Sequence, residues 1–466
     1  MSAAATETEV LSDPQFDVFH NESIDVSANG VWVKILRPVE SLANDGDIRF
    51  EIDGDEKHWL QWGESYISLE AKIRKYNTTG DVVDLDTGDE VIFVNNAAHS
   101  IFQDVNVKIN HNRVEGGNSV YAWLAYVNNL IQFNQAAKGT HMLSQGYHLP
   151  VTTHTTTYDD TKKALVTKAC RWDSDENSVN EVIHKASHNA FMCFTFPLKV
   201  DLFQQGKSCP PGSRVDITLV RNTPSFALFV MKEKVANQRY KIELQNVKLH
   251  MPMIDPNPRL QVQIATKRQN ASILYQFNHL SCFRYTLVNG IVNRVLTNVF
   301  QNKQPKLAIF GLVKSKVFMN AKARPFLFRR HKLSMMTLKT EGRMIGGDAV
   351  NCKDDMNVFS KFNQAVSVFN SNEDVGIDLD QFKDYSWFVA FDCTPNSNVD
   401  AVQEPSRRSY DVEVQFETTL AENLELFCFF IEDKRIILQS NNNVVPNDFI
   451  APNVENAKTP MKRRRV

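Results

Sequence analysis

Carboxylate side chains that could bind a metal gather most densely in the run from Asp84 to Glu90. Oxygen ligands of this kind are those that calcium prefers, usually in a twelve-residue loop closed by a bidentate glutamate. The run lacks the twelve-residue spacing and the closing glutamate of such a loop. A turn exposed to water is therefore the better interpretation.

Histidine and cysteine side chains offer a second set of candidate ligands and nucleophiles. His141, His148 and His154 have the chemistry to bind zinc together, but their spacing matches no compact ligand motif. Cys170 is followed by His184 and His188, yet nothing beside it marks an activated thiolate. The sequence also contains no GxSxG, HExxH, phosphate-binding loop or dinucleotide-binding motif. We therefore predict no catalytic residue, no metal site and no cofactor.

Basic side chains gather in two places. The first lies between residues 324 and 332 and fits either a solvated strand edge or a positive rim at a subunit contact. The second is the C-terminal run of Lys462, Arg463, Arg464 and Arg465. It resembles a short nuclear localisation signal, read by an import receptor. A solubilising tail, or one that contacts packaged nucleic acid weakly, is the alternative.

Composition limits the class of protein that can carry these residues. The 466 residues are 42% hydrophobic and 23% charged, which suits a globular chain with a real core, and the length suits two domains. A net charge of -2 argues against a surface that wraps nucleic acid. No apolar stretch is long enough for a membrane span, and no secretory signal is recognisable. Seven cysteines without a CxxC pair favour a reducing, intracellular location.

Apolar residues recur mostly with a period of two, which is typical of half-buried strands. In residues 66–74, for example, Ile67, Leu69, Ala71 and Ile73 alternate with polar side chains. The other predicted strands are 31–36, 105–109, 191–200, 214–220, 226–231, 240–251, 284–288, 307–313, 326–338, 387–391, 410–416 and 424–431. We expect 214–220 and 226–231 to form a hairpin, and 341–384 to be a long loop.

One segment, residues 119–133, instead has the three- and four-residue spacing of a helix. Its apolar side chains are Val120, Trp123, Leu124, Val127, Leu130 and Ile131. We expect this stripe to be buried against a sheet or a neighbouring domain.

Two stretches about 200 residues apart have similar patterns, and each follows a Phe-rich strand. They are SRVDITLVRNTPSFALFVMKE, which ends at Glu233, and SYDVEVQFETTLAENLELFCFFIED, which ends at Asp433. Such an echo indicates two domains of one type. We expect a flexible arm at 1–25, one domain at 26–236, a second at 237–440 and a flexible basic tail at 441–466.

Longer stretches of the sequence resemble the double jelly-roll major capsid proteins of Polinton/Maverick elements and adintoviruses, in the adenovirus hexon-like lineage. The similar segments are residues 93–133, 196–229, 283–328, 387–394 and 410–433. Their order covers most of residues 45–440. The sequence departs from the family pattern in residues 122–125 and 135–190, which leaves the virus group open.

The resemblance implies an all-β chain of two tandem eight-stranded antiparallel jelly rolls with a few short helices in loops. It implies a homotrimer with a pseudo-hexameric outline, which tiles an icosahedral shell around DNA and contacts neighbouring capsomers and penton or minor capsid proteins. The location would be the virion, with assembly in the host nucleus.

Two other functions stay open at this point. One is a penton or minor capsid protein with a related roll, which a fivefold assembly would distinguish. The other is a carbohydrate-binding or cupin-like jelly roll. A cupin needs histidine and glutamate ligands on its barrel strands, and the sequence has no HxH motif.

Overall fold

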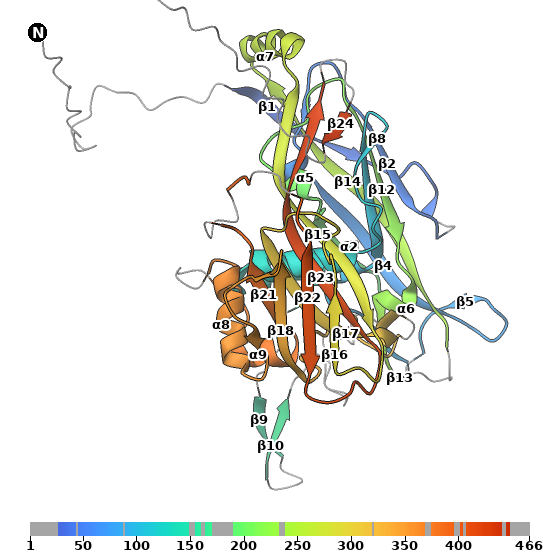
Figure 1. The fold of residues 1–466 in the computed structure, drawn as a ribbon. Coiled ribbons are helices and arrows are strands. Elements are labelled where there is room, and N and C mark those ends of the chain that lie inside the picture. Colours follow the sequence, from blue (N-terminus) through green and yellow to red (C-terminus); the bar gives the residue numbers. More distant parts are fainter. Residues whose placement is uncertain are drawn as a thin grey trace, which may run out of the picture.

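The computed structural model describes residues 27–42, 45–86, 89–148, 154–159, 164–169, 190–232, 238–318, 321–368, 374–395, 401–403, 407–439 and 444–447. The fold is mainly antiparallel sheet with short helices between the strands (Figure 1). The expected arm at 1–25 lies outside the described residues, and so do Lys462–Arg465 of the basic tail. No helix in the described part of the chain is long and apolar enough to cross a membrane.

The first half of the chain forms two sheets that face each other. The strands of one sheet are, in spatial order, β1 (Ala28–Leu36), β14 (Tyr240–Pro256), β4 (Tyr66–Tyr76) and β11 (Met192–Pro197). Those of the other are β2 (Ile48–Asp53), β12 (Arg214–Arg221), β7 (Phe102–Ile109) and β8 (Asn112–Glu115). Numbered one to eight along the chain, these strands have the orders 1-8-3-6 and 2-7-4-5. Two four-stranded sheets connected in this way are a jelly roll.

The second half repeats the same connections. Its first sheet contains β15 (Ile273–Leu287), β23 (Leu424–Leu438), β17 (Leu307–Lys314) and β21 (Phe388–Asp392). Its second sheet contains β16 (Asn293–Leu296), β22 (Tyr410–Phe416), β18 (Leu333–Thr340) and β19 (Arg343–Met344). The orders are again 1-8-3-6 and 2-7-4-5. The expected pair of eight-stranded antiparallel jelly rolls is therefore confirmed.

Shorter elements connect or extend these sheets. The additional strands are β3 (Trp59–Leu60), β5 (Val82–Val83), β6 (Glu90–Phe93), β9 (His154–Asp159), β10 (Ala164–Ala169), β13 (Leu228–Lys232), β20 (Val350–Asn351) and β24 (Val444–Asn447). The α-helices are α1 (Ala97–Ser100), α2 (Tyr121–Gln132), α3 (Gln135–Gly139), α5 (Asp201–Gln204), α6 (Pro224–Ala227), α7 (Pro258–Asn270), α8 (Asp355–Ala365) and α9 (Leu379–Asp384). The 3-10 helices are η3 (Trp62–Glu64), η4 (His141–Gln145) and η5 (Ser315–Phe318).

Strand β4 shows why the alternating pattern produces a two-sheet fold. Ile67, Leu69, Ala71 and Ile73 are all buried in the core of the first roll, as their spacing predicts. The strand lies inside its sheet, between β14 and β11. Both ladders therefore satisfy its backbone, while the apolar face fills the space between the sheets.

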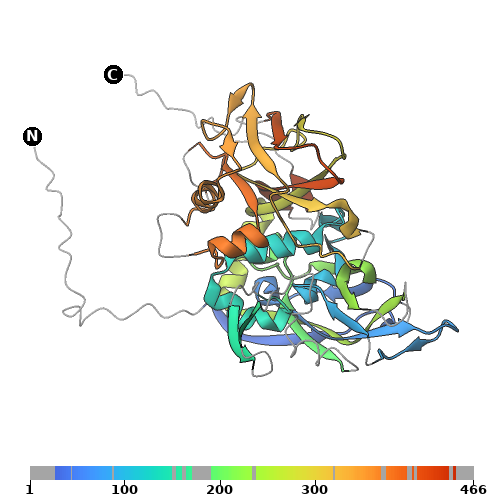
Figure 2. The ribbon, with the colours of Figure 1, turned by 90° about the horizontal axis from the view of Figure 1, so that it is seen from below.

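Helix α2 lies between the two rolls and contributes to both cores (Figure 2). Tyr121 and Ala125 belong to the core of the first roll, whereas Trp123 and Tyr126 belong to that of the second. The Trp123 ring packs 4.3 Å from that of Phe427, measured between centroids. The expected burial of this helix is confirmed, and it penetrates the neighbouring roll.

The long strands β15 and β23 make the reverse contact. They pair along their full length, and one end of the pair extends from the second roll into the first. Tyr275, Phe277, Ile436 and Leu438 at that end belong to the first core. Each roll therefore supplies apolar side chains to the other, and the two form one packed unit.

Strand pairing moves the boundary between the rolls. The second roll was expected from residue 237, but β14 (Tyr240–Pro256) pairs with β1 and β4 and is the eighth strand of the first roll. The echo misled because it matched the β13 region with β23, whose true counterpart is β14. Helix α7 connects the rolls, and the second begins with β15.

Four smaller expectations also differ from the structure. The predicted hairpin is absent among the described strands, because β12 pairs with β2 and β7 whereas β13 pairs with β6. The loop at 341–384 contains α8 and α9, whose N-caps are Asp354 and Asp378. Residues 326–332 precede β18, since Phe326 and Phe328 pack on Trp123 instead. The tail expected from 441 includes β24, which pairs with β23.

Candidate functional site

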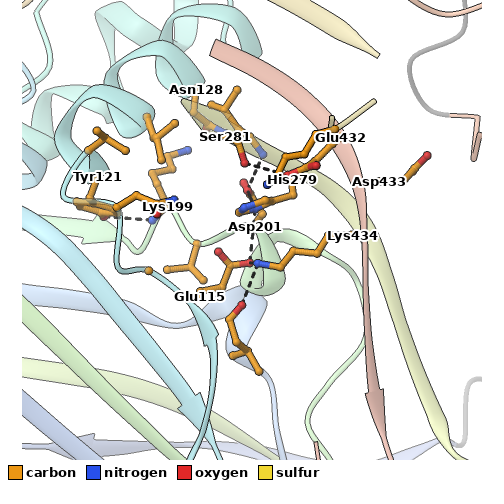
Figure 3. A pocket seen from close by; sticks show the side chains of 18 of the residues that line it. Glu115, Tyr121, Asn128, Lys199, Asp201, His279, Ser281, Glu432, Asp433 and Lys434 are labelled. Carbon is orange, nitrogen blue, oxygen red and sulfur yellow. Dashed lines mark hydrogen bonds and ion pairs between the residues drawn. The ribbon is translucent and has the colours of Figure 1, made fainter. Parts of the chain in front are cut away.

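A polar cleft of about 740 Å³ opens where the two rolls meet (Figure 3). Its walls come from β7, β8, α2 and the segment before α5 in the first roll, and from β15, the 301–304 segment and β23 in the second. Charged side chains of both signs line it.

Four of these groups form a cluster that crosses the junction. Glu115 ends β8 and Asp201 begins α5 in the first roll, while His279 on β15 and Lys434 on β23 belong to the second. His279 Nδ1 lies 2.8 Å from Asp201 Oδ2 and 3.6 Å from Glu115 Oε1. Lys434 Nζ lies 3.4 Å from Glu115 Oε1 and donates a hydrogen bond to the Val114 carbonyl at 2.9 Å. The cluster therefore joins the rolls by charge as well as by packing.

Burial and charge act in opposite directions on His279. Burial alone would lower the pKa of the imidazole, but the Glu115 carboxylate and the hydrogen bond with Asp201 outweigh it, and the pKa is raised. Burial raises the pKa of Glu115, against the opposing charges of His279 and Lys434. With His279 protonated, two carboxylates face two cations, so the buried charges compensate one another.

The same atoms have the chemistry of a metal site. Ligand atoms of Glu115, Asp201 and His279 all lie within 4.8 Å of one another, and they form the one such group of three among the described residues. However, the Lys434 ammonium already supplies a positive charge to Glu115. A divalent cation would have to displace that ammonium and the proton of His279. The geometry therefore favours an ion cluster that holds the rolls together.

Two more ionic features belong to this region. Lys306 is almost fully buried and pairs with Asp433 at 2.6 Å, and its Nζ also donates to Asn278 Oδ1 at 2.8 Å. Lys199 lies over the Phe133 ring at 4.4 Å, and burial lowers the pKa of its amine to about 8. The Asp433 carboxylate thus holds the Lys306 cation in place, and the face of the Phe133 ring holds that of Lys199.

The residues that sequence reasoning singled out lie elsewhere. Within the acidic run, Asp84 pairs with Lys72 at 2.8 Å and with Arg74 at 2.6 Å, and Asp86 pairs with Lys75 at 2.9 Å. These carboxylates neutralise cations of β4, and Asp84 and Asp86 are exposed, as expected of a turn. The expectation of a run exposed to water is wrong at Asp89, which is buried in an ion pair with Lys75.

The histidines do not form a described metal group. His141 is exposed, with its ring 6.1 Å from that of Phe133, whereas the backbone of His148 exchanges two hydrogen bonds with the Asn95 side chain. His154 begins β9. Cys170, His184 and His188 lie outside the described residues.

Three of the five basic residues at 324–332 each contact a different partner. Arg324 stacks over Phe229 at 4.2 Å, Arg329 donates to the Asp384 carbonyl at 3.1 Å, and Arg330 lies 3.7 Å from Glu417. They therefore act as local packing and edge contacts within the second roll and its border.

Sequence reasoning missed the cluster of Glu115, Asp201, His279 and Lys434. These residues are far apart in the chain and match no motif. The available signal was weak: His279 and Lys434 are charged residues inside long strands that are otherwise rich in apolar side chains.

Comparison with known proteins adds information about the fold. No protein-family model matches the sequence. One curated relative is an uncharacterized protein of Caenorhabditis elegans, which is 20% identical over 338 residues, or 71% of this chain and 74% of the relative.

Solved structures with a similar fold come from viruses. A chain from the Sputnik virophage has a TM-score of 0.59 at 13% identity and covers 99% of this chain and 98% of its own. The Faustovirus major capsid protein has a TM-score of 0.56 at 10% identity, with 92% of each chain covered. A chain of the PBCV-1 virus capsid has a TM-score of 0.53 at 10% identity and covers 93% of this chain and all of its own. The likeness extends over both rolls, and it agrees with the strand order in assigning this chain the double jelly-roll fold.

Proposed function

We propose that this protein is a hexon-like major capsid protein, which assembles as a trimer into the shell of an icosahedral DNA virus or virus-like transposon. The observation that carries the proposal is the repetition of one strand order in two rolls that are packed as a single unit. Three such chains around a threefold axis present six similar blocks, which gives a capsomer with a pseudo-hexameric outline.

The structural neighbours support this role. One is described as a major capsid protein and another as part of a virus capsid. The charged groups of the cleft also pair mainly with one another, as expected of residues that hold a structure together. A structural role without catalysis follows from the proposal, with the protein located in the virion and in contact with neighbouring capsomers and penton or minor capsid proteins.

The resemblance to Polinton/Maverick and adintovirus capsid proteins extends the proposal to a lineage. A relative encoded by a nematode supports an element that resides in animal genomes. Sequencing the DNA next to the gene tests the assignment, because such an element would carry other virus-like genes beside it.

A cupin-like enzyme is less compatible with the site. The histidine and carboxylate group lies at the junction of two rolls, whereas a cupin metal is held inside one barrel. A penton or minor capsid protein remains the second candidate. A fivefold assembly would distinguish it from the threefold assembly of a major capsid protein.

The native mass of the purified full chain tests the proposal. Light scattering or native mass spectrometry is expected to give three times the chain mass of 53.1 kDa in assembly buffer. Five chains would favour the penton alternative. A monomer at all concentrations would refute assembly through this fold.

For Lys462–Arg465 we propose nuclear import, since a capsid assembled in the nucleus needs its subunits there. The test fuses residues 455–466 to a large fluorescent cargo in cells. Nuclear accumulation is expected, and it should be lost when Lys462, Arg463, Arg464 and Arg465 are changed to Ala. A fusion that stays in the cytoplasm would leave contact with packaged DNA, which weakens with salt, as the role of these charges.

A further inference from the structure

Helix α7 connects the two rolls (Figure 1). None of its thirteen residues is buried. Isolated helices of this length are marginal in water, so a helix of this kind normally relies on a covered face. Its side towards the first roll carries Gln261, Ile264, Ala265 and Arg268, at the spacing of one helical stripe. A further contact along this stripe would therefore stabilise α7.

The stripe forms one wall of a groove of about 430 Å³. Trp59, Pro210 and Pro211 of the first roll form the opposite wall. The indole Nε1 of Trp59 is buried and has no hydrogen-bond partner among the described residues. A groove with aromatic, proline and aliphatic walls and one unused donor suits a peptide, which brings both apolar side chains and carbonyl acceptors.

The charge of α7 restricts what that peptide can be. Arg259, Lys267 and Arg268 are basic, Arg268 lies on the groove wall, and residues 258–270 contain no Asp or Glu. The one acidic residue on the groove walls is Glu56. An acidic segment with aromatic side chains is therefore the complementary partner.

The first 26 residues of this chain have that composition. They contain six Asp and Glu residues and no Lys or Arg, and Phe16 and Phe19 flank Asp17. The segment also ends at the right place, because the Ser27 carbonyl accepts a hydrogen bond at 2.9 Å from the amide of Asn257, the N-cap of α7. Eight extended residues reach about 26 Å, so Phe19 can reach along the whole helix, whose length is about 20 Å.

We propose that the groove between α7 and the first roll binds the acidic, aromatic segment 1–26 of the same chain. The tether at Ser27 makes this contact intramolecular, with an effective concentration on the order of millimolar. A segment with an intrinsic dissociation constant of about 0.1 mM would then occupy the groove roughly nine-tenths of the time. Occupation covers the stripe of α7, so the helix is steadied by its own N-terminal arm.

Hydrogen exchange of the full chain tests the proposal, compared with a variant that lacks residues 2–22. We expect the α7 amides to exchange roughly tenfold faster without the arm, with β17 and β23 unchanged. A synthetic peptide of residues 8–24 added in millimolar excess should restore the protection. Charge reversal on the groove wall by R268E in the full chain should mimic the deletion, whereas R294E, at an exposed arginine on β16, should not.

Each outcome is decisive. Equal exchange of α7 with and without the arm would refute the proposal. Protection that rises with protein concentration would overturn the intramolecular assignment, because a second copy would then supply the arm. Protection that survives R268E and does not fall with salt would show that charge does not select the partner.

Discussion

Replacing Trp123 with Ala tests whether helix α2 holds the two rolls together. Only 3% of the residue is exposed, and its ring lies within 5.9 Å of five phenylalanine rings, measured between centroids. Four of those rings belong to the second roll, whereas α2 itself is a segment of the first. Truncation of a buried tryptophan costs about 3–5 kcal/mol of unfolding free energy. For units of this size that corresponds to a fall in melting temperature of about 6–20 °C.

Thermal unfolding followed by circular dichroism and calorimetry measures the effect. The matched control is W32A, because Trp32 on β1 is 42% exposed and its ring contacts that of His58. The control should melt within about 2 °C of the parent, since exposed substitutions change stability by about 0.5 kcal/mol or less. We also expect the parent to melt in one transition and W123A in two, because the substitution weakens the contact between rolls. Equal melting of W123A and W32A would refute this reasoning.

The other predictions concern the charged groups at the junction. The pKa of His279 is raised in the folded protein, so its charge stabilises the fold fully below the unfolded pKa of about 6.5, and this stabilisation is lost as the pH rises through the folded pKa. We therefore expect the melting temperature of H279Q to fall less than that of the parent between pH 6 and pH 9. Parallel curves of melting temperature against pH would contradict the protonated state assigned to His279. K306M leaves Asp433 as a buried unpaired charge, which should cost about 3–5 kcal/mol in denaturant unfolding. K314M, whose pair with Glu422 is exposed, should cost about 0–1 kcal/mol, and similar values for the two variants would show that burial of the pair is unimportant.

Local patterns predicted the elements well where one face of an element is buried. The alternation in β4 and the stripe of α2 each reflect a side chain's own environment, so periodicity reveals them. The echo between the two halves also aligned true equivalents, since β12 and β22 are the seventh strands of their rolls and β11 and β21 the sixth.

The pairing of strands that are distant in the sequence could not be predicted from local patterns. Strand β14 looks like any other strand, and only its ladders with β1 and β4 show that it closes the first roll. The cluster of Glu115, Asp201, His279 and Lys434 is hidden for the same reason. Its members are brought together by the packing of one roll on the other, which no spacing in the sequence records.

The exchange of apolar side chains between the rolls has a consequence for how the chain is made. The last strand of the first roll, β14, ends at Pro256, but Ile436 and Leu438 of its core are synthesised about 180 residues later. At roughly 5–20 residues per second, a ribosome needs about 9–36 s to reach them. During that interval the nascent first roll presents Trp123 and Tyr126 on α2 without the completed second roll, in whose core they are buried. Such a surface is a binding site for chaperones and a point of misassembly between neighbouring nascent chains. Completion of the fold is thus tied to synthesis of β23, so a chain terminated before that strand lacks part of both cores.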